Sequence, residues 1–185
     1  IVNKGEGLSS QAVVNRVKRI FGISKAGHTG TLDPMATGVL PVLIGRGVKA
    51  SEFMLTSNKH YGATLLLGVT TDTEDVTGTV LTECDVELGE EQVLSAITGF
   101  VGEIMQTPPM YSALKVGGKK LCDLARRGET VEREARPVTV YSIDARRINN
   151  REYYLDVVCS KGTYIRTLCA DIGKALGVGG TMKTL

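Results

Sequence analysis

The sequence predicts an α+β fold, and three observations support this class. Apolar and polar residues alternate in neighbouring stretches, such as residues 138–148 and 153–160, which is typical of paired antiparallel strands. Helical periodicity is confined to a few segments that do not alternate regularly with the strands. Residues 107–136 interrupt the pattern with two prolines, paired glycines and a short basic helix. These features indicate strands and helices in separate groups, with an inserted helical arm.

Length and charge set limits on the kind of protein. The 185 residues suffice for one domain with a substantial core. The 22 basic and 20 acidic residues give a net charge of only +2, which does not by itself indicate a nucleic-acid-binding protein. If RNA is the partner, the basic residues must therefore cluster on one face.

The four cysteines, at positions 84, 122, 159 and 169, form no C-x-x-C pair, and the two histidines are far apart. We therefore expect no metal site, since zinc ligands usually come in close pairs. Reduced thiols indicate a cytoplasmic protein. No apolar run approaches the roughly 20 residues of a membrane span, and no signal peptide is visible. The chain begins at Ile1 rather than Met, so we expect a few residues to be missing before it.

The first elements of the chain have clear local signals. Residues 1–4 are typical of the end of a strand, and Ser9 or Ser10 is suited to cap a helix that Gly22 ends. The apolar residues of this helix fall on one face, which we expect to be buried: Val13, Val14, Val17, Ile20 and Phe21.

A loop rich in glycine and threonine follows, at residues 26–38, and it leads into residues 39–44, which are almost wholly apolar and predict a buried strand. Asp33 lies in this loop directly before Pro34, which favours an extended backbone at Asp33 and has no N–H to donate. Two interpretations stay open at this point. The carboxylate serves either an ordinary Asx turn or a functional site on a rigidly anchored loop.

Two nucleotide-binding motifs are disfavoured. Residues 45–50 match G-x-G-x-x-A, but no repeated strand–helix–strand pattern follows. A P-loop ending at Lys119 fails, because Ala113 stands where its first glycine is required.

The remaining elements follow from periodicity. We expect strands at residues 59–69 and 79–82, a helix at 90–100 with Val93, Ile97 and Phe100 inward, and a short basic helix at 119–127. The insertion, residues 107–136, is interpreted either as a solvated helical arm or as a mobile segment that grips RNA. In the strand at 153–160 one face is apolar: Tyr153, Leu155, Val157 and Cys159.

The last helix is predicted to be capped by Thr163, with Ile165, Leu168, Ile172 and Leu176 inward. Arg166 falls in its first turn, where the helix dipole mildly disfavours a cation. This position indicates a dedicated anionic partner for Arg166, and a plain surface position is the alternative.

Several separated motifs carry a resemblance to a known family. They read G-H-T-G-T-L-D-P-M-A-T-G-V-L-P at residues 27–41, K-H-Y at 59–61, T-D-T-E-D at 71–75, P-P-M-Y-S-A-L-K at 108–115 and C-S-K-G-T-Y-I-R-T-L at 159–168. Over essentially the whole chain the sequence resembles the TruB family of pseudouridine synthases, although Gly5 stands where that family usually has proline. The resemblance implies the pseudouridine-synthase fold: a mixed, mainly antiparallel sheet with flanking helices, a helical insertion, and an active cleft across the sheet.

The resemblance also implies roles for individual residues. Asp33 is the nucleophile, with attack at C6 of the base or C1′ of the ribose left open, and Arg166 pairs with it. Tyr61 stacks on the base and is a candidate to take the final proton from C5. His28 helps to hold the RNA loop open, and Tyr164 and Leu185 wall the pocket. The chemistry needs no cofactor.

The implied function is isomerisation of a uridine in the T loop of tRNA, at position 55 of the tRNA, to pseudouridine by base flipping. The partner is then the T-stem-loop, and we expect residues 1–185 to be a single catalytic domain, monomeric, whose small C-terminal RNA-binding module is absent. The rival interpretation is a non-catalytic RNA-binding or tRNA-folding module on the same scaffold, but a pure binder has no need of a carboxylate facing phosphate-rich RNA. A phosphohydrolase is disfavoured, because the chain lacks a D-x-D pair and a set of metal ligands.

Overall fold

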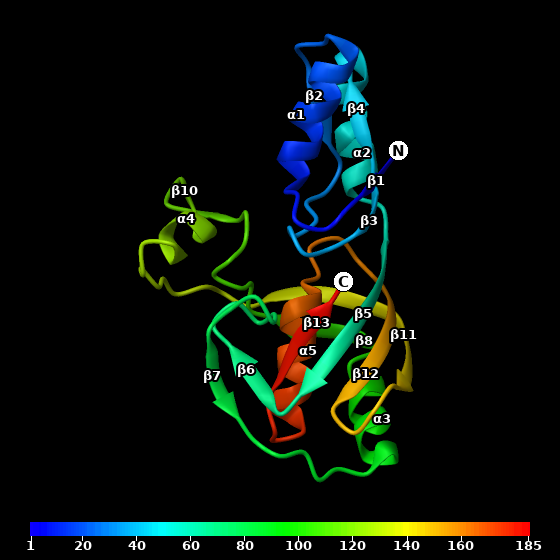
Figure 1. Ribbon diagram of the computed structural model, residues 1–185, viewed down its shortest axis with the longest axis vertical. Coiled ribbons are helices and arrows are strands. Elements are labelled where there is room, and N and C mark those ends of the chain that lie inside the picture. Colours follow the sequence, from blue (N-terminus) through cyan, green and yellow to red (C-terminus); the bar gives the residue numbers. More distant parts are fainter. The chain divides into compact units, whose positions relative to one another are not determined.

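The computed structural model describes the backbone of residues 1–185 and every side chain except that of Leu55. The chain forms two compact units (Figure 1). Unit 1 comprises Ile1–Asn58 and Thr184–Leu185, and unit 2 comprises Lys59–Lys183. Helices and antiparallel sheets occur together, so the predicted α+β class is confirmed. The organisation of residues 1–185 as a single catalytic domain stays a prediction.

Unit 1 is built from short strand pairs and one long helix. Strand β1 (Val2–Lys4) pairs antiparallel with β3 (Gly38–Leu40), and β2 (Ala26–His28) pairs antiparallel with β4 (Val42–Ile44). Helix α1 (Ser10–Phe21) packs against β2. The 3₁₀ helix η1 (Gly45–Ala50) and helix α2 (Ser51–Leu55) complete the unit.

The predicted ends of α1 are confirmed, but its predicted buried face is only partly correct. The Ser9 side chain accepts the Ala12 N–H at 3.1 Å, and Gly22 ends the helix with a left-handed φ of 60°. Ile20 and Phe21 are 68% and 65% exposed, however. The buried residues of this face, Val13 and Val14, lie in the first half of the helix, whereas Val17 is half-buried.

The prediction of one buried strand at residues 39–44 is wrong. Pro41 has no N–H to donate, and the ladder breaks there. Residues before it join β1 and residues after it join β2. Val39 is 69% exposed and Ile44 is half-exposed, so Leu40 is the buried residue of this stretch.

Unit 2 is organised around a five-stranded sheet with the order β13 (Gly180–Thr184), β5 (Lys59–Leu67), β12 (Glu152–Cys159), β11 (Arg136–Arg147) and β8 (Gly102–Gln106). Strand β12 pairs antiparallel with both β5 and β11, and β11 pairs antiparallel with β8. The expected strands at residues 59–69, 138–148 and 153–160 are confirmed. Strands β8 and β13 were not predicted.

The core of unit 2 lies between this sheet and two helices, α3 (Glu90–Thr98) and α5 (Ile165–Ala175). Helix α3 packs on β11, and α5 packs on β5 (Figure 1). The inward faces largely follow the predicted periodicity, and the buried residues are Val93, Ile97, Tyr153, Leu155, Val157, Cys159, Ile165, Leu168 and Ile172. Phe100 and Leu176 are only half-buried.

The predicted cap of α5 is wrong. The Thr163 hydroxyl donates to the Ser160 carbonyl at 3.0 Å, which draws it back into the preceding turn, and Tyr164 takes the N-cap position.

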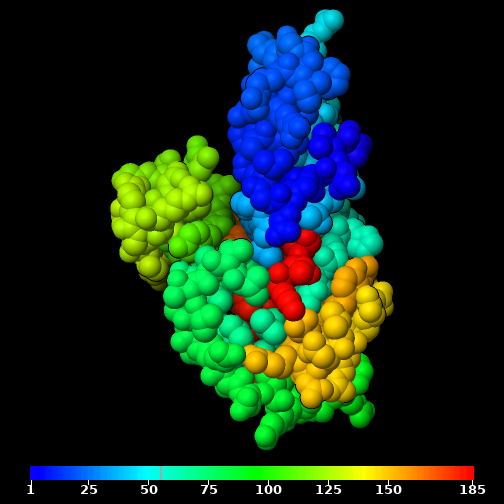
Figure 2. Space-filling view, in the orientation of Figure 1, coloured from blue at the N-terminus to red at the C-terminus, as the bar shows by residue number. Residues whose placement is uncertain are grey.

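The remainder of unit 2 consists of a hairpin and the insertion. The hairpin joins β6 (Val69–Thr71) to β7 (Val80–Glu83). The insertion carries β9 (Lys115–Val116), β10 (Lys119–Lys120) and α4 (Leu121–Ala125), and stands out as a yellow-green lobe of unit 2 (Figure 2). The expected helix at 119–127 is shorter than predicted, because its first two residues pair in β10. Among the described residues, no helix has the length and apolar character that crossing a membrane requires.

Candidate active site

The candidate nucleophile, Asp33, lies in unit 1 on the loop between β2 and β3, and hydrogen bonds fix this loop on both sides of it. Ser10 Oγ accepts the Leu32 N–H at 2.9 Å and donates to the Leu32 carbonyl at 3.1 Å. On the other side the Ala36 N–H donates to the Asp33 carbonyl at 3.0 Å. Asp33 is half-buried. Its backbone is therefore held in one conformation by bonds to neighbouring residues and to the start of α1.

A buried lysine contacts the same loop. Lys4 is 1% exposed, and its Nζ donates to the Pro34 carbonyl at 3.0 Å and to the Gly5 carbonyl at 2.9 Å. Burial lowers the pKa of Lys4, whereas the negative charges of Asp33 and Glu6 raise it. Sequence reasoning gave Lys4 no role, because a lysine at the end of a short strand is ordinarily solvated.

Two other predicted site residues belong to unit 1. The Leu185 carbonyl accepts the Thr37 N–H at 3.0 Å, so Leu185 is tied to the loop that carries Asp33. His28 is half-buried in β2, and its Nδ1 is buried without a hydrogen-bond partner in the part of the chain that the structure describes. A buried ring nitrogen with no partner is a group that a ligand can satisfy.

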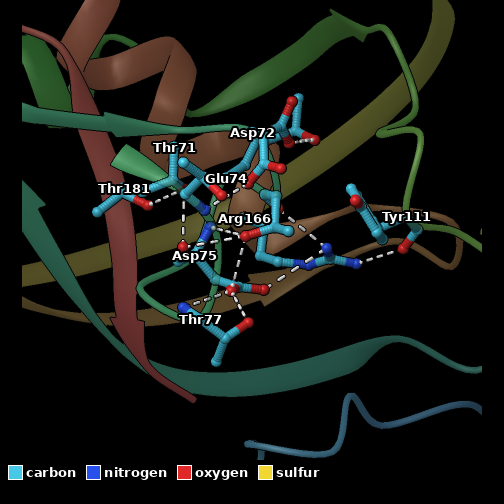
Figure 3. A network of polar contacts seen from close by, with 11 residues as sticks. Thr71, Asp72, Glu74, Asp75, Thr77, Tyr111, Arg166 and Thr181 are labelled. Carbon is cyan, nitrogen blue, oxygen red and sulfur yellow. Dashed lines mark hydrogen bonds and ion pairs between the residues drawn. The ribbon is translucent and has the colours of Figure 1, made fainter. Parts of the chain in front are cut away.

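Unit 2 contains the second half of the predicted set, with Arg166 at its centre (Figure 3). Arg166 lies in the first turn of α5 and is 5% exposed, so the alternative of a surface position is wrong. Its Nη1 donates to the Thr73 carbonyl at 3.0 Å and lies 3.6 Å from Asp75 Oδ2. Its Nη2 donates to the Tyr111 carbonyl at 2.8 Å. The expected anionic partner exists, and one such partner is Asp75.

Asp75 is itself buried, and hydrogen bonds from neighbouring residues hold its carboxylate in place. Its Oδ1 accepts the Thr77 N–H at 2.9 Å, the Thr77 hydroxyl at 2.5 Å and the Thr73 hydroxyl at 2.9 Å. Its backbone carbonyl accepts the Thr71 hydroxyl at 2.7 Å. A buried ion pair that is supported by further hydrogen bonds, as here at Oδ1, holds its members in one geometry. The turn that contains Thr73 and Asp75 thus fixes the orientation of the Arg166 guanidinium.

Glu74, next to Asp75, adopts an unusual conformation. Its φ of 63° is the one positive value among the non-glycine residues described by the structure. Its carboxylate accepts the Thr167 hydroxyl at 2.6 Å. Burial raises the pKa of Glu74, and the bond from Thr167 and the charge of Arg166 oppose that rise. The strained backbone therefore turns Glu74 toward α5 while Asp75 faces Arg166 (Figure 3).

The two candidate pocket tyrosines are also placed in unit 2. Tyr61 is half-buried on β5, directly opposite Val157 of β12. Tyr164 precedes α5, and its backbone is clamped by Gln106: the Tyr164 N–H donates to Oε1 at 3.0 Å, and Nε2 donates to the Tyr164 carbonyl at 3.2 Å. Gln106 is 1% exposed. Sequence reasoning missed this glutamine, since it lies 58 residues from Tyr164 in the chain.

The structure therefore assembles two preorganised sets of residues. Unit 1 holds the Asp33 loop with Lys4 and Leu185, and unit 2 holds Arg166 with Asp75 and the backbone of Tyr164. The predicted pairing of Arg166 with Asp33 joins residues of different units and stays a prediction. Sequence reasoning also missed Asp75, although three carboxylates within the five residues of the T-D-T-E-D turn were a signal that one of them has a cationic partner.

Residues 18–165 match the family model described as TruB family pseudouridylate synthase (N terminal domain). The chain is 49% identical over 182 residues to the tRNA pseudouridine synthase B of Alkaliphilus oremlandii, covering 98% of this chain and 61% of that protein. It is 50% identical to that of Clostridium kluyveri, covering 100% and 64%, and 48% identical to that of Haemophilus influenzae, covering 97% and 57%. The chain thus spans about three fifths of the length of these relatives.

Solved structures agree on the fold. The chain is similar to a chain of a Cbf5-Nop10-Gar1 complex, with a TM-score of 0.76 and 33% identity, over 98% of this chain and 45% of that one. It is also similar to a chain of an H/ACA RNP bound to a substrate RNA containing 2′-deoxyuridine, with a TM-score of 0.71 and 29% identity, over 98% and 44%. These matches confirm the predicted pseudouridine-synthase fold.

Proposed function

The chain belongs to the TruB family of pseudouridylate synthases, and we propose that it isomerises a uridine in the T loop of tRNA, at position 55, to pseudouridine. The names of the relatives that are about 50% identical support tRNA as the substrate. The observation that carries the proposal is Asp33 itself. A pure RNA-binding module has no use for a carboxylate on a rigidly bonded loop that also buries a lysine.

The reaction breaks the C1′–N1 bond and forms a C1′–C5 bond within the same nucleotide. C5 loses its proton and N1 gains one, so the product is an isomer and no cofactor is consumed. Asp33 acts as the nucleophile that separates bond breaking from bond making. A stacked uridine cannot be reached in place, so the base is flipped out at a cost of a few kcal/mol.

The other residues prepare this step. Arg166 keeps Asp33 ionised and aimed, because an adjacent guanidinium favours the charged form of a carboxyl group. Asp75 and the Thr73 carbonyl hold Arg166 for that task. Tyr61 stacks on the flipped base, and Tyr164 and Leu185 enclose it. His28, with its buried Nδ1, helps to hold the RNA loop open.

The direct test is incubation with a T-stem-loop, followed by detection of pseudouridine in the digested RNA. The control RNA carries cytidine in place of the target uridine. Pseudouridine at the target position is the expected result. Tight binding of the hairpin without conversion would instead support the RNA-binding or tRNA-folding module.

Substitution of Tyr61 separates stacking from proton transfer. Tyr61→Phe should bind RNA like the parent, because stacking is worth about 1–3 kcal/mol per base and needs only the ring. Its turnover should fall sharply if the hydroxyl takes the C5 proton. Tyr61→Leu should lose both binding and turnover. Binding constants and single-turnover rates measure these effects, and equal binding by the Phe and Leu variants would argue against stacking.

We expect the insertion to be mobile without RNA and ordered with it. Beyond residue 112 its own core is small, with Leu121 and Leu124 as the buried residues of α4, so this outer part has little buried surface to fix it. Five of its exposed cations lie in or next to β9, β10 and α4 and suit RNA phosphates: Lys115, Lys119, Lys120, Arg126 and Arg127.

Amide hydrogen exchange with and without the T-stem-loop tests this expectation. Replacing the five cations by Gln should flatten the salt dependence of binding while the RNA that does bind is still converted. Strong protection of the insertion in free protein, unchanged by RNA, would show a fixed element instead.

A further inference from the structure

Charge is distributed unequally between the two units. Unit 1 contains seven Lys and Arg residues against three Asp and Glu residues, whereas unit 2 contains fifteen against seventeen. Unit 1 therefore has a net charge of +4 and unit 2 a net charge of −2 at pH 7. The near-neutral total conceals a strongly basic small unit.

Most of this positive charge lies at one end of unit 1. Lys18 and Arg19 are in the last turn of α1. Lys25 follows, and its carbonyl accepts the Gly45 N–H at 2.8 Å, which brings the start of η1 beside it. Arg46 and Lys49 are in η1. We call these five residues the basic end.

The cations of the basic end are not used for internal ion pairs. In the part of the chain that the structure describes, none of the five pairs with a carboxylate. The one acidic residue close to them in the sequence is Glu52 of α2. In unit 2, by contrast, Arg147 pairs with Glu90 at 3.2 Å and Lys183 pairs with Glu152 at 2.7 Å. The basic end therefore carries uncompensated charge.

Apolar side chains accompany these charges. Ile20 and Phe21 directly follow Arg19 in α1 and are mostly exposed. Exposed apolar groups among cations indicate a surface that meets a partner rather than water alone. The helix dipole favours cations at a helix C-terminus, which accounts for Lys18 and Arg19. It does not account for Lys25 and Arg46, or for the exposure of Ile20 and Phe21.

The basic end is separated from the Asp33 loop by the length of α1. Ser10 at the start of α1 is bonded to Leu32, next to Asp33, while the basic end begins at the last turn. Eleven helical steps cover about 17 Å, which is at least about five nucleotides along one strand of a duplex. The basic end is therefore too far away to contact the nucleotide that reacts at Asp33.

From these observations we propose that the basic end of unit 1 binds the sugar-phosphate backbone of the helical stem that carries the target loop. The inference rests on the proposed function, because the position of the loop at Asp33 sets where the stem runs. Lysine and arginine side chains on an exposed surface suit phosphates, which position a nucleic acid without reading its sequence. An A-form stem is recognised chiefly through its backbone and shape. The contact would hold the RNA in register without reading its sequence.

The test compares two hairpins with the same loop, one with a stem of about three base pairs and one with about twelve, so that only the longer stem spans the distance estimated above. The test variant is Arg19→Gln/Lys25→Gln/Arg46→Gln. The matched control removes three exposed cations of unit 2, as Arg147→Gln/Lys174→Gln/Lys183→Gln. Both keep the full chain and every residue assigned to the active site.

For the parent and the control, we expect the long hairpin to bind at least about 10-fold more tightly than the short one at about 0.15 M salt. The test variant should lose that advantage, with a log–log salt slope for the long hairpin lower by about 2–3. Its turnover of saturating RNA should match the parent.

Two results would overturn the inference: equal loss of affinity for both hairpins, or equal behaviour of the test and control variants. In the second case the test variant keeps the long-stem preference, and the basic end would have to serve another partner, such as an acidic protein surface. Absence of pseudouridine from the parent's reactions would count against the proposed function alone, because the binding comparison does not depend on conversion.

Discussion

Asp33→Asn is expected to reduce pseudouridine formation below detection while RNA binding stays within a few fold of the parent. The amide has the shape of the carboxylate but is not a competent nucleophile. The loop should persist, because the bonds from Ser10, Ala36 and Lys4 involve the backbone around Asp33 rather than its side chain. Single-turnover assays with a T-stem-loop measure the effect.

A nearby carboxylate provides the control. Asp33 and Glu6 both raise the pKa of the buried Lys4, so Glu6→Gln also removes a negative charge that acts on Lys4. It should convert RNA like the parent. The melting temperatures of both variants distinguish an inactive protein from an unfolded one. If the pure Asp33→Asn variant still formed substantial pseudouridine, the nucleophile would have to be sought elsewhere.

Arg166→Lys is expected to lower turnover at least about 100-fold although the charge is kept, an effect comparable to removal of one preorganised donor from a buried site. A single ammonium cannot bond the Thr73 carbonyl, the Tyr111 carbonyl and Asp75 in the planar arrangement of a guanidinium. Each buried carbonyl left without its donor also costs about 1–3 kcal/mol of stability.

Asp75→Asn tests the same network from its other side. Removing one member of a buried ion pair costs about 3–5 kcal/mol, so its melting temperature should fall. Arg147→Lys changes an exposed, paired arginine of the same unit and should leave both turnover and stability close to the parent values. Parent-like turnover by the Arg166→Lys variant would mean that the proposed pairing with Asp33 is unimportant.

Local signals predicted much of the fold. Ser9 and Gly22 set the ends of α1 through contacts within four residues, and the alternation in β12 follows from the geometry of a single strand. Features that depend on distant partners were missed. The break at Pro41 depends on which strands lie on either side of it, β1 for the residues before and β2 for the residues after.

The candidate site shows the same division. Long motifs located Asp33 and Arg166, but nothing in their spacing indicated that Asp75 would be the buried partner of Arg166, or that Gln106 would clamp Tyr164 from 58 residues away. Both contacts arise only when the sheet and α5 have formed. The pattern of residues along the sequence therefore does not predict these two contacts.

The bond from Arg166 to the Tyr111 carbonyl divides the insertion into a root and a free part. Pro108, Pro109 and Ser112 are buried around that carbonyl, whereas Gly117, Gly118 and Gly128 have positive φ values further out. Movement of the root would remove the Tyr111 carbonyl from the buried Arg166 guanidinium, which would leave a buried donor without its acceptor. We therefore expect any motion of the insertion to be confined to the residues after the root. Changes in the length, charge or RNA preference of the outer lobe should consequently leave the position of Arg166 unchanged. Residues after 112 can therefore be engineered to alter the choice of RNA, while the residues that hold Arg166 for the reaction are left intact.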